Sequence, residues 1–273
     1  MSLLGFQRAL SDLAASPALV QAVRGAGAGA AALAAYELTS LETRRLAAVA
    51  GQRGMAVNCT LYRSNRLGSI LQTFPLTSHL LEGRLREVAD RFFAAHPTPA
   101  IATRRELRRF SAFVLASVEE GWLDVPFLAE VMLLEQAQYD LALLPRRLVE
   151  ARAARRAAHW PDGPVTPHPM VRVVRFGHDP SALFPLLLRK APAPYEGVPA
   201  GEFHLLLDLR GGVRRVTLLD AASGRLLGAL QDGAAADATE ALEPFLAAGL
   251  LVRTIPRKAA KHPQRRPEMA AAA

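Results

Sequence analysis

The sequence has a single cysteine, Cys59, among its 273 residues. No disulfide can therefore form within the chain, and no cysteine cluster can bind a metal ion. The sequence also lacks an uncharged apolar run of about 18 residues, which a helix needs to cross a membrane. The N-terminal segment carries charges at helical spacing instead of the basic stub and apolar core of a signal peptide. We therefore expect a soluble cytoplasmic protein.

Signatures of catalysis are also missing. None of the seven histidines belongs to a paired metal-binding spacing such as His-Glu-x-x-His, and no Gly-x-Ser-x-Gly nucleophile motif occurs. No sequence feature indicates a lowered pKa for Cys59, so a buried core thiol is favoured over a nucleophile. Glu42 and Glu106 stand at helix-capping positions and do not suggest an acid–base pair. These absences favour a binding subunit over a complete enzyme.

Aromatic residues are scarce, at 6% of the chain, and alanine and leucine supply much of the 51% hydrophobic fraction. This composition favours helices. The net charge of +8 is concentrated in residues 146–156 and 257–266. These basic clusters lack interleaved aromatic residues, so solvated faces and a loose tail are favoured over nucleic-acid binding, which stays as the alternative.

The N-terminal part of the chain shows repeated helix signals. Thr39 and Glu42 have the spacing of a capping box at the start of one helix. Gly54 is expected to cap the end of that helix, and residues 55–71 to form the next one. Thr77 is expected to be the N-cap of a third helix. Similar patterns continue to about residue 145.

A polar stripe distinguishes the helix over residues 55–71. Asn58, Tyr62, Asn65 and Arg66 recur at three- and four-residue intervals. Amide and guanidinium groups are suited to holding the backbone or a carboxylate of another chain. The alternative is that these groups make internal hydrogen bonds to neighbouring helices.

The second half of the chain has a different hydrophobic period. Strands are expected at residues 171–176 and 250–254, and a β-hairpin at residues 202–219 around Arg210-Gly211-Gly212. Helices are expected over residues 179–189, 221–230 and 236–248. We therefore predict an α+β protein: an all-helical, bundle-like N-terminal domain followed by a small winged-helix-like α+β domain with a β-hairpin. The expected boundaries are a helical domain at 1–145, a linker at 146–169, the α+β domain at 170–256 and a disordered tail at 257–273.

A resemblance to a known family rests on the N-terminal half. The stretch YELTSLETRRLAAVAGQRGMAVNCTLYRSNRLGSILQTFPLTSHLL, the following RFFAAHP, and the later GLL resemble the partner proteins of multinuclear non-haem iron-dependent oxidative enzymes. These relatives include the second subunits of the methanobactin and thiaglutamate pathways. They also include a family labelled as DNA-binding domains that is often encoded beside such enzymes.

The resemblance implies a non-catalytic accessory subunit in ribosomal peptide natural-product biosynthesis. The partner would be a TIM-barrel oxidase carrying two or three irons, forming a heterodimer with this chain, which would itself carry no iron and no other cofactor. This chain would hold a ribosomally made precursor peptide and present its modifiable residue to the iron site. The α+β domain would bind the leader by adding it as a strand to a sheet edge.

Two sets of residues become candidate sites under this interpretation. The stripe Asn58, Tyr62, Asn65 and Arg66 is expected to contact the oxidase. The leader is expected to lie beside strand 213–219 and helix 236–248. The strand offers Arg214, Val216 and Leu218 on one face, while Val213 and Leu219 are expected to pack on the helices. The helix offers Leu242, Phe245 and Leu246, for which a core position is the equal alternative.

A different class of function stays open. The chain could be a DNA-binding or regulatory protein that uses the winged-helix-like domain. The partner-subunit hypothesis predicts a stable complex with an iron protein. The DNA-binding hypothesis predicts binding to DNA whose affinity falls steeply with salt.

Overall fold

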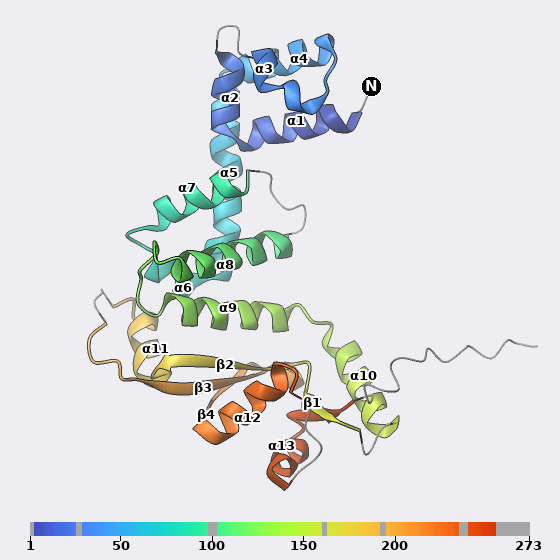
Figure 1. Ribbon diagram of the computed structural model, residues 1–273, viewed down its shortest axis with the longest axis vertical. Coiled ribbons are helices and arrows are strands. Elements are labelled where there is room, and N and C mark those ends of the chain that lie inside the picture. Colours follow the sequence, from blue (N-terminus) through green and yellow to red (C-terminus); the bar gives the residue numbers. More distant parts are fainter. Residues whose placement is uncertain are drawn as a thin grey trace, which may run out of the picture. The chain divides into compact units, whose positions relative to one another are not determined.

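The computed structural model describes residues 3–25, 29–97, 103–159, 163–191, 195–234 and 240–254. The chain divides into two compact units, Met1–Glu135 and Gln136–Ala273, called here the helical unit and the mixed unit. Helices make up the first, and the second adds small antiparallel sheets (Figure 1). The predicted α+β class, with a helical N-terminal region ahead of a mixed region, is confirmed. Among the described residues, no helix is long and apolar enough to cross a membrane.

The described part of the helical unit consists of helices of unequal length. They are α1 (Leu3–Ala15), α2 (Pro17–Arg24), α3 (Gly29–Ala32), the 3₁₀ turn η1 (Ala34–Tyr36), α4 (Ser40–Gly51), α5 (Gly54–Thr73), α6 (Pro75–Leu80), α7 (Leu85–Ala95) and α8 (Thr103–Glu119). The next helix, α9 (Leu128–Ala142), crosses the division between the units.

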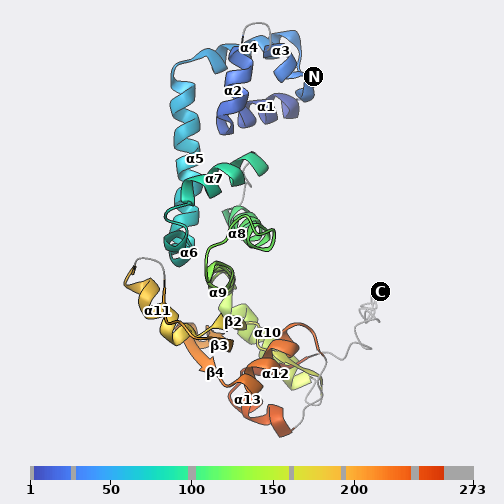
Figure 2. The ribbon, with the colours of Figure 1, turned by 60° about the vertical axis from the view of Figure 1, so that its left-hand side comes forward.

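Helix α5 connects two groups of helices within this unit. Helices α1, α2 and α4 gather around its first half and α6–α8 around its second (Figure 2). The first group encloses an aliphatic core that includes Leu13, Leu46 and Cys59. The second contains a cluster of aromatic rings, in which Phe92 and Phe110 meet edge to face at 5.2 Å between centroids. The long helix thus contributes to both cores.

Local capping decides where these helices begin. The capping box is confirmed: Thr39 accepts from the amide of Glu42, whose carboxylate accepts from the amide of Thr39 at 2.8 Å. The predicted cap at Gly54 is wrong, since α4 ends at Gly51 and Gly54 begins α5. The predicted N-cap at Thr77 is also wrong. Pro75 occupies the first turn of α6, where its fixed φ favours the helix, and leaves Thr77 buried inside.

In the residues that the structure describes, the mixed unit contains five short strands and several helices. They are α10 (Arg146–His159), β1 (Val165–Pro167), β2 (Val171–His178), α11 (Pro180–Leu188), β3 (Ala200–Asp208), the turn η2 (Arg210–Gly212), β4 (Arg215–Leu219), α12 (Ala221–Gln231), η3 (Glu240–Leu242), α13 (Glu243–Ala247) and β5 (Leu251–Arg253). One sheet has the antiparallel order β2-β3-β4, and β1 pairs with β5 in a second. The predicted hairpin is confirmed as β3–η2–β4.

The core of this unit lies between the three-stranded sheet and α12 (Figure 1). Val173 is paired with Leu206 across the sheet, and both belong to one buried cluster with Leu227 and Leu230 of α12. Alternate residues of β2 and β3 therefore point toward α12, as the period of a strand requires.

Two predicted segments differ from the structure, and a third lies outside the described residues. The expected linker, residues 146–169, contains α10 and β1, and the compact units meet ten residues before it, at Glu135 and Gln136. Alanine and arginine favour the helical α10, which lies against β5 and buries Ala153. The expected helix over 236–248 is limited to η3 and α13, with residues 235–239 outside the described part. The expected disordered tail, 257–273, also lies outside it.

Candidate functional site

Strand β4 is an edge of the three-stranded sheet. In the described part of the chain it pairs with β3 alone, so one side of its backbone has no partner strand. Its residues Arg215–Leu218 are all exposed, including Val216 at 46% and Leu218 at 47%. Proteins usually protect sheet edges, because an edge with exposed apolar side chains readily pairs with another chain. Such an edge is suited to binding an extended segment.

The register fixes which side chains share a face of β4. Val216 pairs with Leu207, and Leu218 pairs with Leu205; both partners on β3 are buried. Arg214 precedes the strand at the same alternation, and its Nη1 donates to Oε1 of Gln138 at 2.9 Å. We call Arg214, Val216 and Leu218 the β4 row. The structure thus brings these three predicted site residues together.

The opposite face of β4 matches the prediction in part. Leu219 packs against the core cluster beside α12, as expected. Val213 does not, because it is 67% exposed in the segment before the strand. Its predicted packing is wrong, since η2 ends only one residue earlier and the regular alternation begins after Val213.

The three predicted residues of the last helix belong to the core. Leu242 is fully buried in the cluster that contains Val171 and Leu227. Phe245 and Leu246 are partly buried against the same cluster. The alternative interpretation, that these side chains are core residues, therefore holds for Leu242, which has no surface to offer a peptide.

A partly buried ion pair shapes the turn that leads into β4. Arg210 donates to Asp208 through Nε at 2.9 Å and Nη2 at 2.8 Å, and its Nη1 reaches the backbone oxygen of Ala248 at 2.7 Å. Burial alone would raise the pKa of Asp208, but the hydrogen bonds and charge of Arg210 lower it overall. The turn itself needs glycine, because Gly211 and Gly212 have φ of 68° and 84°. The pair holds the β3–β4 connection against the end of α13.

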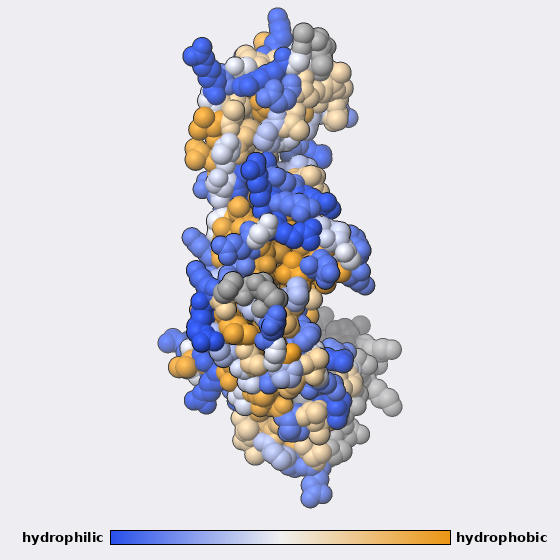
Figure 3. All heavy atoms as spheres, turned by 90° about the vertical axis from the view of Figure 1, so that its left-hand side faces the viewer, coloured by the Kyte–Doolittle hydropathy of each residue, from blue (hydrophilic) through white to orange (hydrophobic). Residues whose placement is uncertain are grey.

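The helical unit offers a second exposed apolar surface. Figure 3 shows hydrophobic residues exposed in several places among hydrophilic ones. One open groove lies between α1 and the start of α5, and its lining includes Asn58 of the predicted stripe. Around Asn58, the exposed side chains are Leu10 at 38%, Val57 at 60% and Leu61 at 57%. We call this set the α1–α5 groove.

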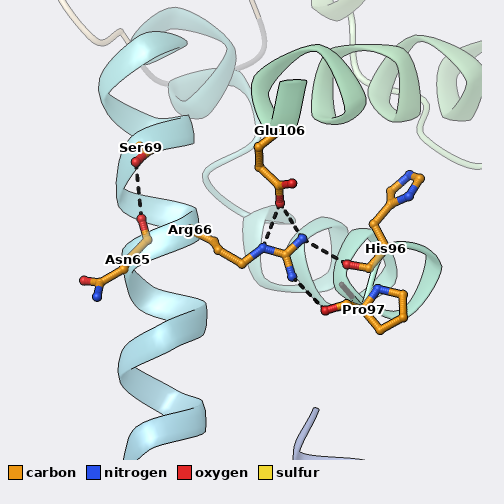
Figure 4. Close-up of polar contacts among 6 residues, drawn as sticks. All are labelled: Asn65, Arg66, Ser69, His96, Pro97 and Glu106. Atoms are coloured by element: carbon orange, nitrogen blue, oxygen red, sulfur yellow. Dashed lines mark hydrogen bonds and ion pairs between the residues drawn. The ribbon is translucent and has the colours of Figure 1, made fainter. Parts of the chain in front are cut away.

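Arg66 does not share that surface. Its side chain is buried, and its guanidinium donates to Oε1 of Glu106 and to the backbone oxygens of His96 at 2.9 Å and Pro97 at 3.3 Å (Figure 4). It also lies 4.6 Å from the ring centroid of Phe93. The alternative interpretation, internal hydrogen bonding, therefore holds for Arg66.

The other members of the stripe differ in exposure. Asn58 and Asn65 are exposed and Tyr62 is half-buried. The side chain of Asn65 points away from the Arg66 cluster (Figure 4). Of the four predicted residues, Asn58, Tyr62 and Asn65 thus have surface available for a partner, while Arg66 connects α5 to α8 and to the end of α7.

Sequence reasoning missed two buried polar side chains, those of Glu135 and His204. Glu135 of α9 accepts from the amides of Leu76 at 2.8 Å and Thr77 at 2.9 Å, and so caps the start of α6. The imidazole of His204 is buried, with no hydrogen-bond partner for Nδ1 among the described residues. Neither carries a local sequence signal. Within the described ranges, no group of three or more His, Cys, Asp or Glu residues could hold a metal ion.

Comparisons with known proteins identify no family for this chain. No protein-family model matches it, and neither does any curated protein. The resemblance described above therefore rests on the quoted residues alone.

Proposed function

We propose that this chain is a non-catalytic partner subunit that binds a ribosomally made precursor peptide and presents it to a TIM-barrel multinuclear iron oxidase. The observation that supports peptide binding is the free edge of β4 with its exposed Val216 and Leu218. The identity of the enzyme partner and of its chemistry rests on the sequence resemblance. Iron would belong to the oxidase.

Strand addition accounts for the features of this edge. An extended peptide beside β4 would form backbone hydrogen bonds, each contributing about 0.5–1.5 kcal/mol net. Alternate side chains of the peptide would cover Val216 and Leu218, which supplies register as well as affinity. Four or five such bonds, about the length of β4, would suffice for a specific but reversible complex.

A pair of proline substitutions tests where the peptide binds. In an antiparallel pair, successive residues direct their amides alternately toward the partner strand and away from it. Of Val216→Pro and Thr217→Pro, one therefore removes an outward amide and the other a bond to β3. The outward variant is expected to keep its circular dichroism spectrum and melting temperature but to lose peptide binding. Undiminished binding by a folded outward variant would exclude the β4 edge.

Co-expression tests the partner. The chain is expressed with a TIM-barrel multinuclear iron enzyme and a short precursor peptide chosen from the open reading frames that neighbour its gene, and the complex is isolated through a tag on the chain. We expect both to co-purify and the iron to be found with the enzyme. About one or more irons held tightly per chain, in the absence of the enzyme, would contradict the accessory role.

We assign the contact with the oxidase to the α1–α5 groove. Leu61→Asp places a charge in the groove and is expected to abolish co-purification at unchanged melting temperature. Leu148→Asp on α10 is the matched control, because Leu148 is also an exposed helical leucine, at 48% against 57% for Leu61. If the two variants co-purify with the oxidase to the same extent, the α1–α5 groove is not the contact surface.

One observation favours the DNA-binding alternative. Helix α10 has five arginines and one glutamate, and most of it is exposed. A nucleic-acid function predicts binding of duplex DNA whose affinity falls steeply as salt rises, without co-purification of an iron protein. The same preparation of the chain serves for both assays.

A further inference from the structure

The turn end of β4 is basic, and neither Arg214 nor Arg215 forms a direct ion pair with a carboxylate in the described part of the chain. Arg214 and Arg215 are both exposed. Arg214 donates to the neutral amide of Gln138, and Arg215 forms no ion pair with any residue that the structure describes. The guanidinium of Arg146 lies against Gly212 in the same connection, and its Nε is 3.9 Å from Oε1 of Glu150. An incoming strand would therefore meet positive charge at this end.

The acidic groups near β4 are already engaged. Asp208 is paired with Arg210 at 2.8 Å. Asp220, directly after the strand, caps α12 by accepting from the amide of Ser223 at 2.9 Å. Glu202 is paired with Arg225, also at 2.9 Å. None of them neutralises Arg214 or Arg215 through a direct ion pair.

We infer that the peptide strand bound at β4 has the pattern acidic–x–apolar–x–apolar, with its carboxylate beside Arg214, the arginine of the β4 row. This inference rests on the proposed function and specifies its ligand. In an added strand, every second side chain lies beside the β4 row. A carboxylate opposite Arg214 therefore places the next two residues of that face opposite Val216 and Leu218. The acidic residue of the peptide lies at the end of β4 nearest η2, whether the peptide runs parallel or antiparallel to β4.

Charge argues against the nearest competing occupant. Residues 257–273 of this chain contain three arginines and two lysines against one carboxylate, that of Glu268. Their net charge has the same sign as the turn end of β4, which opposes their binding there. Nucleic acid would supply negative charge, but its backbone offers no side chains to cover Val216 and Leu218.

A peptide library tests the pattern with the full chain. Immobilised decapeptides contain two valines separated by one residue. Glutamate, glutamine or lysine is placed at each remaining position in turn, on both sides of the valine pair. Binding is expected to be strongest with glutamate two residues from the nearer valine. Glutamine there is expected to weaken binding about two- to fivefold, the usual effect of one or two exposed ion pairs, and lysine to weaken it further.

A charge swap supplies the decisive comparison. The double variant Arg214→Glu, Arg215→Glu is expected to prefer lysine where the parent prefers glutamate. The matched control is Arg155→Glu, Arg156→Glu, two exposed arginines of α10, which changes the net charge equally and should keep the preference for glutamate. Both variants are checked by circular dichroism and thermal melting.

The outcomes distinguish a failure of the inferred charge pattern from a failure of peptide binding at β4. One outcome is equal affinity for peptides with glutamate, glutamine or lysine, together with loss of binding in the outward proline variant. This result would overturn the charge pattern and leave strand addition intact. Binding by no peptide, or binding that survives the outward proline variant, would overturn strand addition at β4. Capture of a short duplex DNA in place of all peptides would favour the nucleic-acid alternative.

Discussion

Replacing Arg66 should destabilise the helical unit far more than an exposed arginine does. The guanidinium of Arg66 is buried against Glu106, the last carbonyls of the α7 end and the ring of Phe93. Removing one partner of a buried ion pair leaves the other charge without compensation and costs about 3–5 kcal/mol. Arg66→Met is therefore expected to lower the free energy of unfolding by that amount. For a unit of this size the melting temperature should fall by about 10 °C or more.

Arg63 provides a matched control on the same helix. It also lies over the ring of Phe93, with 4.9 Å from its guanidinium carbon to the centroid, and it pairs with Asp90. The two side chains of that pair are 29% and 56% exposed, against 6% and 8% for Arg66 and Glu106. An exposed pair contributes about 0–1 kcal/mol. Arg63→Met should therefore have a small effect, and the contrast isolates burial as the cause.

Urea unfolding followed by circular dichroism measures both variants. The transition midpoint should shift strongly for Arg66→Met, with little change in the slope, since the exposed surface on unfolding stays similar. A double-mutant cycle with Glu106→Leu should show a favourable coupling energy, because the double variant no longer buries a lone charge. If Arg66→Met costs less than about 1 kcal/mol, Arg66 does not lie in the buried arrangement of Figure 4.

Three further predictions concern stability and reactivity. Gly224→Ala should destabilise the mixed unit by about 1–3 kcal/mol in thermal melts, because the new Cβ would overlap the buried ring of His204, whereas Gly228→Ala on the same helix meets no atom within 4 Å and should be neutral or slightly stabilising. Burial raises the pKa of Glu135, although hydrogen bonds from two amides oppose this, so the folded chain keeps a proton that the unfolded chain has lost. Stability should therefore fall as the pH rises from the ordinary carboxyl pKa through the raised one, and urea titrations of Glu135→Gln should lack that slope. Cys59 is buried, its Sγ donates to the backbone oxygen of Leu13 at 3.3 Å, and burial raises its pKa; labelling with a thiol reagent should therefore proceed only as fast as the unit unfolds.

Local features of the fold could be predicted from the sequence. The capping box of Thr39 and Glu42 and the N-cap Asp179 of α11 involve groups within three residues of one another. The β3–β4 hairpin follows from two adjacent glycines between alternating strands. Such contacts are determined by the residues that make them, so pattern alone suffices.

Contacts between distant residues could not be predicted in the same way. Arg66 and Glu106 are separated by 40 positions, and Leu76 and Glu135 by 59. Each residue of these pairs looks like an ordinary member of its own helix until the packing is known. For this reason the sequence pattern predicts a surface position for Arg66, whereas only Asn58, Tyr62 and Asn65 of the stripe have exposed surface in the structure. Helix α10 was missed for a related reason, since it has almost no apolar stripe and depends on its contact with β5.

The two unusual properties of β4 explain each other. An edge with Val216 and Leu218 exposed would invite pairing with any extended chain, including other copies of itself. The adjacent Arg214 and Arg215 oppose association with basic segments, and this chain has an excess of positive charge. A strand with a carboxylate at the matching position would instead gain from the same arginines. Charge at one end of the edge can thus discourage wrong partners and select the right one, while the apolar pair and the free backbone supply the affinity.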